Sequence, residues 1–320
     1  MIPSLEVLLV DNASGDNSVS TMSNGLADLI SEGFVKLMPL HLNGGFGWAN
    51  NQALLMLLAQ EKPPEFVMLL NPDCTIEPFA IRHLLDELLS SENCAVAGSQ
   101  LLNPDGSCTG SAFRFPSIGR ELVRGARIEK LGRLLRIAPT LVASNAPCEA
   151  DWVTGASCLI RTTALASEGL FDDGFFLYFE EVELMFRLRK ARWAIRHVPI
   201  SRAFHIGGAS TGLGDRSNSV RELPFYWFES RRRFFTLAYG SHRAWLAAIA
   251  WLMGTIICRC VAAISKSRFD PTMAGNRRRL LSHGLRSNTN DRLRSIVQVY
   301  DEMNKPPRWM GFLESEVIDT

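Results

Sequence analysis

The sequence lacks the cysteine spacings that build disulfide scaffolds and zinc knuckles. Its seven cysteines are odd in number and no two of them have the CxxC spacing, so neither kind of framework is predicted. Residues 1–10 contain Glu6 and lack the basic leader of a secretory signal peptide. These absences favour a reducing compartment, and we expect the protein to lie in the cytoplasm.

The sequence also lacks an uncharged run long enough to span a membrane. Residues 244–258 are uncharged and bounded by Arg243 and Arg259, but this run is shorter than the roughly 20 residues of a spanning helix. A buried helix of a C-terminal bundle and an in-plane or re-entrant membrane helix both fit the pattern. Basic residues crowd the last third of the chain and favour an anionic membrane surface as a partner. They are Arg231, Arg232, Arg233, Lys266, Arg268, Arg277, Arg278, Arg279 and Arg286.

Short apolar runs of strand length alternate with longer helical patterns. Strands are expected at residues 7–10, 35–37 and 66–70, and helices at 46–59 and 79–89. This rhythm predicts an α/β fold with a mostly parallel sheet and helices on both faces. The ligands of such sheets bind beyond the carboxyl ends of the strands.

The second half of the chain is less regular. Residues 107–150 lose the regular strand and helix pattern and are rich in Gly, Pro and Arg, with a short basic amphipathic segment near 122–137. This composition predicts an insertion over the sheet. The periodic pattern resumes after this segment. Strands are expected at 153–160, 194–197 and 202–205, and a helix at 179–191. After Pro224 the composition becomes aromatic, basic and apolar. We therefore expect a sheet domain over residues 1–224 and a helical C-terminal region over residues 225–320.

A carboxylate follows one of the buried strands. Asn71-Pro72-Asp73 comes directly after the strand expected at 66–70, on a turn that Pro72 stiffens. Mg²⁺ takes one or two protein carboxylates and completes its shell with substrate phosphate oxygens. Asp73 is therefore a candidate metal ligand beside a diphosphate, although Asn-Pro-Asp alone is also an ordinary turn.

Polar residues follow the first strand as well. Asp11 offers an acceptor for the imide N–H of uracil or thymine, with Asn12 beside it and Ser14 capping the next segment. An Asx turn is the alternative, because aspartate at a strand end commonly accepts a hydrogen bond from the backbone ahead of it.

A glycine cluster precedes the first long helix. Asn43-Gly44-Gly45 is similar to a phosphate-cradling loop, but it lacks the GxGxxG spacing of dinucleotide-binding proteins. Asn50 and Asn51 lie on the first helical turns, where they face the same ligand or merely solvate the helix.

Three carboxylates occupy four residues at a predicted helix start. The helix dipole stabilises Glu180, Glu181 and Glu183 there, so a structural role is one alternative. Glu183 and Arg187 are spaced to pair at i,i+4, which leaves the other two glutamates for proton chemistry. Aromatic neighbours would raise a carboxylate pKa toward that of a useful base. His205, a lone histidine after a short strand, is either a metal or phosphate ligand or a packed residue.

In this order, these segments resemble the family 2 glycosyltransferases of GT-A fold, and among them the bacterial rhamnosyltransferase-like members that build cell-wall or surface polysaccharide. The resemblance runs from about Leu5 to about Arg233. It implies the GT-A fold, a Rossmann-like fold of nucleotide-diphospho-sugar transferases, followed by a C-terminal helical extension. The motifs that carry it are VDNAS at 10–14, NGGFGWANN at 43–51, LLNPD at 69–73, NPDG at 103–106, WVTGA at 152–156, GLFDDGFFLYFEEVEL at 169–184, and His205.

The resemblance also implies a role for each matching residue. Asp11 would recognise the base, and Asn71 and Asp73 would be the ends of a DxD-like metal and diphosphate site, with His205 as a further metal or phosphate contact. Glu180 and Glu181 fall on a Glu-Asp pair whose second member is the general base. The implied nucleotide-sugar site comprises Asp11, Asn12, Ser14, Asn43, Gly44, Gly45, Asn50, Asn71 and Asp73, and the implied acceptor side comprises Trp152, Gly155 and Ala156.

The implied reaction is an inverting sugar transfer. The base takes the proton of an acceptor hydroxyl, which attacks the anomeric carbon opposite the diphosphate, and a divalent metal, Mg²⁺ or Mn²⁺, neutralises the leaving group. The donor would be a dTDP or UDP sugar, with L-rhamnose a candidate, and the acceptor a lipid-linked or polysaccharide glycan. The basic C-terminal region would hold the enzyme peripherally at the inner membrane face, and no nucleic acid is expected as a partner.

Two features depart from the family pattern. The acidic pair is Glu-Glu, so that the presumed base, Glu181, is one methylene longer than aspartate. The family begins with a strand, a nucleotide-contacting loop and a helix of roughly thirty residues in all, whereas this chain opens on what should be strand two. We expect a misplaced start codon or a truncation, and the alternative function is a truncated, non-catalytic nucleotide-sugar-binding remnant. A nicotinamide-dependent dehydrogenase is disfavoured by the missing glycine fingerprint.

Overall fold

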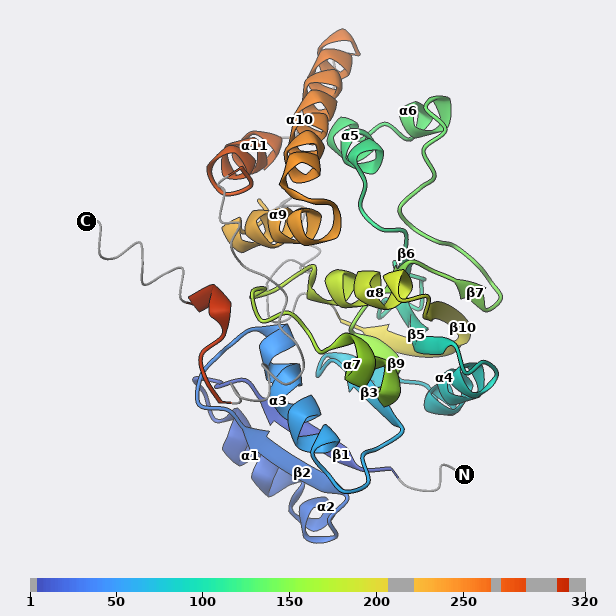
Figure 1. The fold of residues 1–320 in the computed structure, drawn as a ribbon, viewed down its shortest axis with the longest axis vertical. Helices are drawn as coiled ribbons and strands as arrows, with labels where there is room; N and C mark the ends of the chain where they lie inside the picture. The colour runs from blue at the N-terminus through green and yellow to red at the C-terminus, as the bar shows by residue number, and fades with distance from the viewer. Residues whose placement is uncertain (1–4, 207–221, 266–271, 286–303, 311–320) are drawn as a thin grey trace, which may run out of the picture.

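The computed structural model describes residues 5–206, 222–265, 272–285 and 304–310 (Figure 1). Lys266, Arg268 and Arg286 of the basic set lie outside the described residues. The strands are β1 Val7–Asp11, β2 Val35–Pro39, β3 Phe66–Leu70, β4 Cys74–Ile76, β5 Cys94–Leu102, β6 Ala112–Phe113, β7 Cys148–Glu149, β8 Trp152–Val153, β9 Ser157–Arg161 and β10 Ala194–His205. The helices are α1 Ser18–Gly25, α2 Ala27–Ser31, α3 Phe46–Leu58, α4 Ala80–Leu89, α5 Ile118–Ala126, α6 Glu129–Leu134, α7 Thr162–Glu168, α8 Glu180–Lys190, α9 Phe225–Tyr239, α10 Ser241–Ile264, α11 Thr272–Ser282 and the 3₁₀ helix η1 Arg308–Met310.

The N-terminal strands form a small sheet of their own. β1 and β2 are parallel and in register from Val7 opposite Val35 to Asp11 opposite Pro39. Helix α3 packs against this pair through Trp48. The two strands and the helix confirm the elements expected at 7–10, 35–37 and 46–59. Within the described part of the chain, no ladder joins this pair to the main sheet.

The main sheet has the order β3-β9-β5-β10-β4, with β7 also paired to β10. Only β5 and β10 run parallel in it, whereas the other neighbours are antiparallel. The α/β class is therefore confirmed, but the expectation of a mostly parallel arrangement is wrong for this sheet. An unbroken apolar strand indicates burial on both faces and carries no information about its direction. The apolar middle of β9, residues 158–160, is buried between β3 and β5, and the strand is antiparallel to both.

Two strand predictions differ from the structure in their bounds. β10 is one strand of 12 residues where two short ones were expected, and its register with β5 shifts between Val198 and Arg202. Pro199 lies in that bulge, where its missing N–H breaks no ladder bond. The strand expected at 153–160 is divided into β8 and β9 by the turn through Gly155.

Neighbouring residues of the central strands face opposite helical layers, as the two-residue period of a strand requires. Val96 of β5 belongs to one core cluster with Leu184 of α8. The next residue, Ala97, belongs to another with Leu84 of α4. Helices therefore cover both faces of the sheet, as expected.

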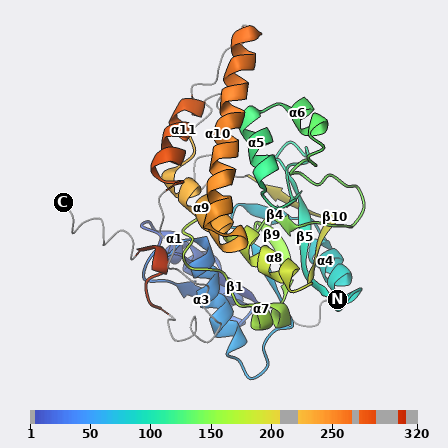
Figure 2. The same ribbon diagram turned by 45° about the horizontal axis from the view of Figure 1, so that its top comes forward.

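Helix α5 of the predicted insertion packs against the C-terminal helix α10 (Figures 1 and 2), whereas the ends of the insertion lie on the sheet, where β7 pairs with β10 and Ala112 joins the core cluster. A Cβ on Gly125 of α5 would lie 2.2 Å from a backbone oxygen of α10, and one on Gly254 of α10 would lie 2.2 Å from a backbone oxygen of α5. Both glycines thus let the two helix backbones approach closely. A buried ion pair of 2.6 Å between Glu121 and Arg231 joins α5 to α9. The apolar side of the insertion finds its partner on α10, which the local sequence pattern does not reveal.

Helix α10 is longer than the uncharged run that predicted it. It extends over 24 residues because Arg243 and Arg259 continue the helix, and arginine has a good helix propensity. By length and composition it is the one described helix that could cross a membrane, with 33% of its most apolar window buried. The expectation of a segment too short to span is therefore wrong for the helix as a whole. Exposed apolar side chains on α10 are Trp245, Leu246, Met253, Ile256, Val261 and Ile264.

Candidate active site

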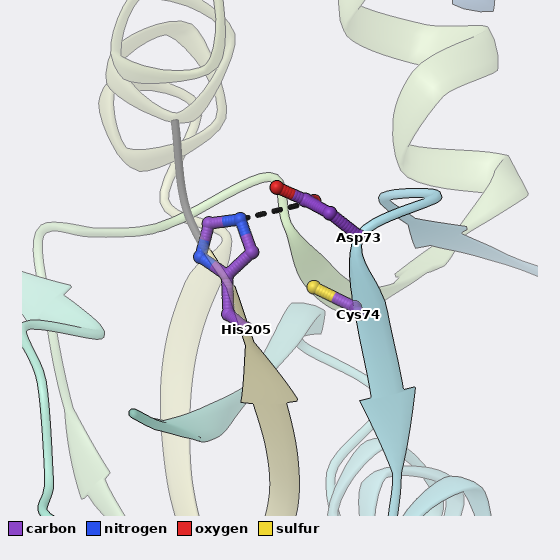
Figure 3. Close-up of side chains that lie close together, drawn as sticks. All are labelled: Asp73, Cys74 and His205. Carbon is purple, nitrogen blue, oxygen red and sulfur yellow. Dashed lines mark ion pairs between the residues drawn. The ribbon is translucent and has the colours of Figure 1, made fainter. Parts of the chain in front are cut away.

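The Asn71-Pro72-Asp73 turn joins β3 to β4 beside the end of β10 (Figure 3). β4 and β10 pair so that Cys74 is opposite His205. The backbone N–H of Ile206 donates to the carbonyl oxygen of Asp73 at 3.1 Å. This pairing brings Nε2 of His205 to 3.1 Å from Oδ1 of Asp73. The sheet edge thus unites the two residues predicted as metal ligands.

The side chains at this edge have the chemistry of a cation site. Asp73, Cys74 and His205 are each half-buried, and their potential ligand atoms all lie within 4.8 Å of one another. The carboxylate is the hard oxygen ligand that Mg²⁺ and Mn²⁺ prefer, the imidazole can be a second ligand, and a thiol selects softer metals. Two protein ligands leave positions for water and phosphate oxygens. The donor set therefore fits a divalent cation that binds together with a diphosphate.

A short backbone link runs from this turn to the start of α8. The N–H of Asn71 donates to the carbonyl oxygen of Ala156 at 2.9 Å. A Cβ on the preceding residue, Gly155, would lie 3.9 Å from Cβ of Glu181 and 3.3 Å from the ring of Phe46. Two of the residues predicted for the acceptor side therefore lie between the candidate metal ligands and the candidate base.

Glu180 and Glu181 begin α8 with their carboxylates enclosed by protein. Glu180 is buried and Glu181 is half-buried, and Oε2 of each has no hydrogen-bond partner among the described residues. Burial raises the pKa of Glu181 to about 7. Burial, with the neighbouring Glu181 charge, raises the pKa of Glu180 well above its usual range. Burial thus disfavours the charged form of both carboxyl groups, and Glu181, with a pKa of about 7, can be ionised near neutral pH and accept a proton.

The backbone turns sharply before these glutamates. Tyr178 and Phe179 have φ values of 69° and 70°, a left-handed conformation that costs a residue other than glycine about 1–3 kcal/mol. Such strain clusters at functional sites. It places the start of α8 directly after the turn, with Glu180 at its first position.

Glu183 has the structural role that its spacing predicted. The Nε atom of Arg187 donates to both oxygens of Glu183, at 2.8 and 3.0 Å. The same guanidinium donates to the carbonyl oxygen of Leu170 at 2.6 Å. Burial raises the pKa of Glu183, and the Arg187 charge opposes that rise. This pair fastens α8 to the loop before it, which leaves the first two glutamates for chemistry.

The glycine loop, residues 43–45, lies beside the end of β1. The side chain of Asn12 bridges the two, since Nδ2 donates to Oδ1 of Asn43 at 2.9 Å and Oδ1 accepts from the N–H of Gly44 at 3.2 Å. Gly45 has φ 86°, and a Cβ there would lie 2.1 Å from the carbonyl oxygen of Phe176. Only glycine fits this position. The loop is thus held against the segment that leads into Glu180.

The other predicted binding residues have identifiable local partners. Oδ2 of the buried Asp11 accepts from the N–H of Ser14 at 3.0 Å, which is the Asx-type bond considered above. Asn50 donates to the carbonyl oxygen of Phe46 in its own helix at 2.9 Å. Asn51 is buried and bonds the backbone of Phe171 in both directions, at 2.8 and 3.0 Å. Asn51 therefore holds α3 against the loop between α7 and α8 and does not face a ligand.

Trp152, predicted for the acceptor side, is packed between two core clusters. Its ring stacks on Phe113 with centroids 4.3 Å apart, and its indole N–H donates to the carbonyl oxygen of Arg114 at 3.3 Å. These contacts give it a packing role and hold β8 in front of Gly155.

Sequence reasoning missed the residues that reach this site from the C-terminal end of the chain. The indole N–H of Trp309 donates to the carbonyl oxygen of Gly44 at 2.9 Å, across a separation of 265 residues. No periodicity or motif spacing connects positions so far apart. The ring of Phe176 lies against Trp309 and its carbonyl oxygen lies against Gly45. Phe176 falls inside a motif to which sequence analysis gave a role only through its glutamates.

The chain is similar in sequence to known sugar transferases. No family model matches the sequence. The chain is 28% identical over 268 residues to N-acetylglucosaminyl-diphospho-decaprenol L-rhamnosyltransferase of Mycobacterium tuberculosis, covering 80% of this chain and 82% of that protein. It is 26% identical over 174 residues to rhamnosyltransferase WbbL of Escherichia coli, covering 50% of this chain and 60% of that protein.

The fold also has a solved counterpart. The chain is similar to the crystal structure of GalNAc-T7 with UDP, GalNAc and Mn²⁺, with a TM-score of 0.52 and 14% identity over 88% of this chain. It spans about half of that structure, 48% of its length. The sequence relatives are sugar transferases and the shared fold is that of a GT-A enzyme. The chain is a glycosyltransferase of GT-A fold.

Proposed function

We propose that this glycosyltransferase inverts the anomeric carbon as it moves a sugar from a nucleoside-diphosphate donor of the dTDP or UDP type to a lipid-linked or polysaccharide acceptor. L-rhamnose is the first donor sugar to test, because two sequence relatives are rhamnosyltransferases. Cell-wall or surface glycan synthesis is the process in which such a product would be used.

One observation carries the proposal. Two carboxylates are enclosed at the start of α8 with an oxygen of each left without a partner among the described residues, and Gly155 and Ala156 link them to the turn that bears Asp73. Buried carboxylates are costly unless they are paired. Raised pKa values beside a candidate ligand site are typical of catalytic groups. The alternative of a non-catalytic remnant gives no reason for retaining these unpaired carboxylates.

Each residue then has a chemical role. Glu181, whose side chain is half-buried, takes the proton of the acceptor hydroxyl. Asp73 and His205 would hold the divalent cation, whose chemistry when bound is to neutralise charge on the diphosphate. The glycine loop, whose conformation is held by Asn12, would lie against the donor.

The experiment is a donor screen on the full-length chain. Nucleoside diphosphate release would be followed for dTDP-rhamnose, UDP-galactose and UDP-N-acetylglucosamine, each with a polyprenyl-diphosphate sugar acceptor, in Mn²⁺ and in EDTA. We expect acceptor-dependent release with one donor and loss of that release in EDTA. Absence of turnover with every pair, together with absence of nucleotide binding, would contradict the proposal.

Replacement of Gly45 tests the fit of the glycine loop. We expect Gly45→Ala to raise the donor KM at least tenfold, because the new Cβ would have to move the Phe176 backbone. The matched control is Gly33→Ala: Gly33 has φ 75° and nothing within 4 Å of its added Cβ, so this variant carries only the backbone cost of about 1–2 kcal/mol. Steady-state kinetics and a thermal melt of both variants separate the two effects. Equal donor KM values in the two variants would show that the contact with Phe176 is unimportant.

We also propose that the enzyme is cytoplasmic and lies peripherally on an anionic membrane surface, through the end of the molecule formed by α10 and α6. In both views the far half of α10 extends beyond the body of the protein (Figures 1 and 2). Ile256 and Ile264 are 56% and 83% exposed there, and Leu134 of α6 is 79% exposed. Basic residues accompany these apolar groups on α6 and α10, among them Arg133 and Arg259. Apolar insertion and attraction to anionic lipid would act together at such a surface.

Vesicle sedimentation tests this attachment. We expect the protein to sediment with phosphatidylglycerol vesicles more than with phosphatidylcholine vesicles, and less so as salt is raised. The double variant Ile256→Asp/Ile264→Asp should lower vesicle binding at least tenfold. Leu89→Asp, on α4 and equally exposed at 56%, should bind as the wild type does. Vesicle binding by the double variant at the wild-type level would contradict the assignment of this surface.

A further inference from the structure

The described residues at the C-terminal end, 304–310, return to the N-terminal part of the molecule and are called here the C-terminal clasp. Its start is fastened to helix α3. The N–H of Asn304 donates to Oε1 of Gln52 at 3.0 Å. The indole N–H of the buried Trp48 donates to the carbonyl oxygen of Lys305 at 3.0 Å. Two side chains of α3 therefore fix where the clasp begins.

The end of the clasp touches the glycine loop and Phe176 at once. The indole N–H of Trp309 donates to the carbonyl oxygen of Gly44 at 2.9 Å. Its ring lies 4.6 Å, centroid to centroid, from the ring of Phe176. Phe176 in turn accepts a backbone hydrogen bond from Phe46 at 3.2 Å. A single side chain thus joins the loop before α3 to the segment that enters α8.

Charged groups anchor the clasp beside these contacts. The guanidinium of Arg308 bonds Asp172, and its Nε lies 2.5 Å from Oδ1 of Asp173. The buried Asp172 is also paired with Arg233 of α9 at 2.8 Å. A buried carboxylate between two guanidiniums is strongly held, because loss of either partner leaves charge poorly compensated. The clasp therefore has a fixed place on the loop between α7 and α8.

We propose that Trp309 and Arg308 are positioning residues of the donor site, which hold the glycine loop and Phe176 in the conformation that receives the nucleoside-diphosphate part of the donor. The proposal rests on the function proposed above. Asn12 bonds the side chain of Asn43, the N–H of Gly44 and the carbonyl oxygen of Gly45, and Trp309 adds a bond to the carbonyl oxygen of Gly44. Without Trp309, the loop keeps the Asn12 contacts and the backbone hydrogen bond from Phe46 to Phe176, but it loses the bond that holds the Gly44 carbonyl and the ring that packs on Phe176. Donor binding should then weaken, while the proton transfer at Glu181 is spared.

The test compares Trp309→Phe, which removes the indole N–H and keeps a ring on Phe176, with Trp245→Phe, the same change at an exposed tryptophan of α10. Calorimetry with UDP and with dTDP in Mn²⁺, and steady-state kinetics, are the measurements. We expect Trp309→Phe to weaken nucleotide binding and raise the donor KM about fivefold, the effect of one hydrogen bond, with kcat within twofold of wild type. Trp309→Ala should raise KM further, and Trp245→Phe should change neither constant.

The outcomes separate the two proposals. A lower apparent kcat with unchanged KM and unchanged nucleotide affinity would mean that Trp309 only supports the fold, and would overturn the positioning role. Wild-type constants in both Trp309 variants would overturn it as well, and leave the transferase function standing. A wild-type chain that binds neither nucleotide would overturn the proposed function, and the positioning role with it.

For Arg308, we expect Arg308→Lys to restore part of the nucleotide affinity that Arg308→Gln loses.

Discussion

Glu181→Gln is expected to lower kcat about a thousandfold while the donor KM stays within a few-fold of wild type. General-base catalysis contributes about 10²–10⁴ in rate, and glutamine keeps the shape of the side chain without accepting a proton. Steady-state kinetics with saturating donor measure the loss, and nucleotide calorimetry measures the retained binding. Glu180→Gln is the matched control, because burial and the neighbouring Glu181 charge raise the pKa of Glu180 well above its usual range and disfavour its charged form. We expect that variant to lose less than tenfold.

The role of Glu181 as base also predicts how the activity of the wild type depends on pH. Glu181 acts in its ionised form, and its pKa lies at about 7. Activity should therefore rise with pH through about 7 and level above it, with about a tenfold loss at pH 6. A rate that is flat between pH 5.5 and 8.5, or normal turnover by Glu181→Gln, would contradict the role of Glu181 as base.

The dependence of protein stability on pH provides a second test, because stability should fall as pH rises while activity increases. The pKa of Glu181 is raised in the folded state, from its ordinary value of 4.5 to about 7, so the folded chain binds this proton more tightly than the unfolded chain does. The associated stability is fully present below about pH 4.5 and is lost as pH rises through about 7, a loss of about 3 kcal/mol. Glu181→Gln removes the buried charge. Its melting temperature should therefore exceed that of the wild type at pH 8 and approach it at pH 5.

Asp73→Ala is expected to lower kcat/KM about a thousandfold and to abolish the dependence of the residual rate on Mn²⁺. Asp73 supplies the hard ligand of the candidate cation site, and loss of electrostatic stabilisation of this kind costs about 10²–10³ in rate. Titration of activity with Mn²⁺ and with EDTA checks the first expectation. Calorimetry with Mn²⁺ in the presence of UDP or dTDP checks binding directly.

The chain offers a matched control for this variant. Asp105 belongs to a second Asn-Pro-Asp tripeptide, at an exposed turn where its carboxylate accepts from Ser107 at 3.0 Å. Asp105→Ala should keep both the rate and the Mn²⁺ dependence of the wild type. If Asp73→Ala turned over normally, or lost activity only because it unfolded, the metal-binding role would be wrong.

Much of the site could be predicted because its residues follow buried strands and begin helices. Strand periodicity located β1, β2 and β3, although β1 and β2 form a sheet separate from that of β3. The i,i+4 spacing of Glu183 and Arg187 separated the structural glutamate from the two that are enclosed without partners. The pairing of Asp73 with His205, by contrast, depends on β4 adding antiparallel to β10, which no local pattern contains.

The remaining features depend on contacts between distant segments. An apolar strand such as β9 is buried in a parallel or an antiparallel sheet alike, so its direction was not readable. The extent of α10 was underestimated because Arg243 and Arg259 are compatible with a helix interior. The clasp joins Trp309 to Gly44 by one hydrogen bond to a backbone oxygen, and any residue offers that oxygen. Long-range packing of this kind leaves no signature in a single sequence.

The anomeric configuration of the transferred sugar tests the proposed mechanism most directly. With an active donor and acceptor pair, the one-bond carbon–hydrogen coupling at the anomeric centre would be measured by NMR in donor and in product. A single attack assisted by Glu181 opposite the diphosphate predicts inversion. Retention of configuration would contradict it, because retention requires a route other than one direct displacement.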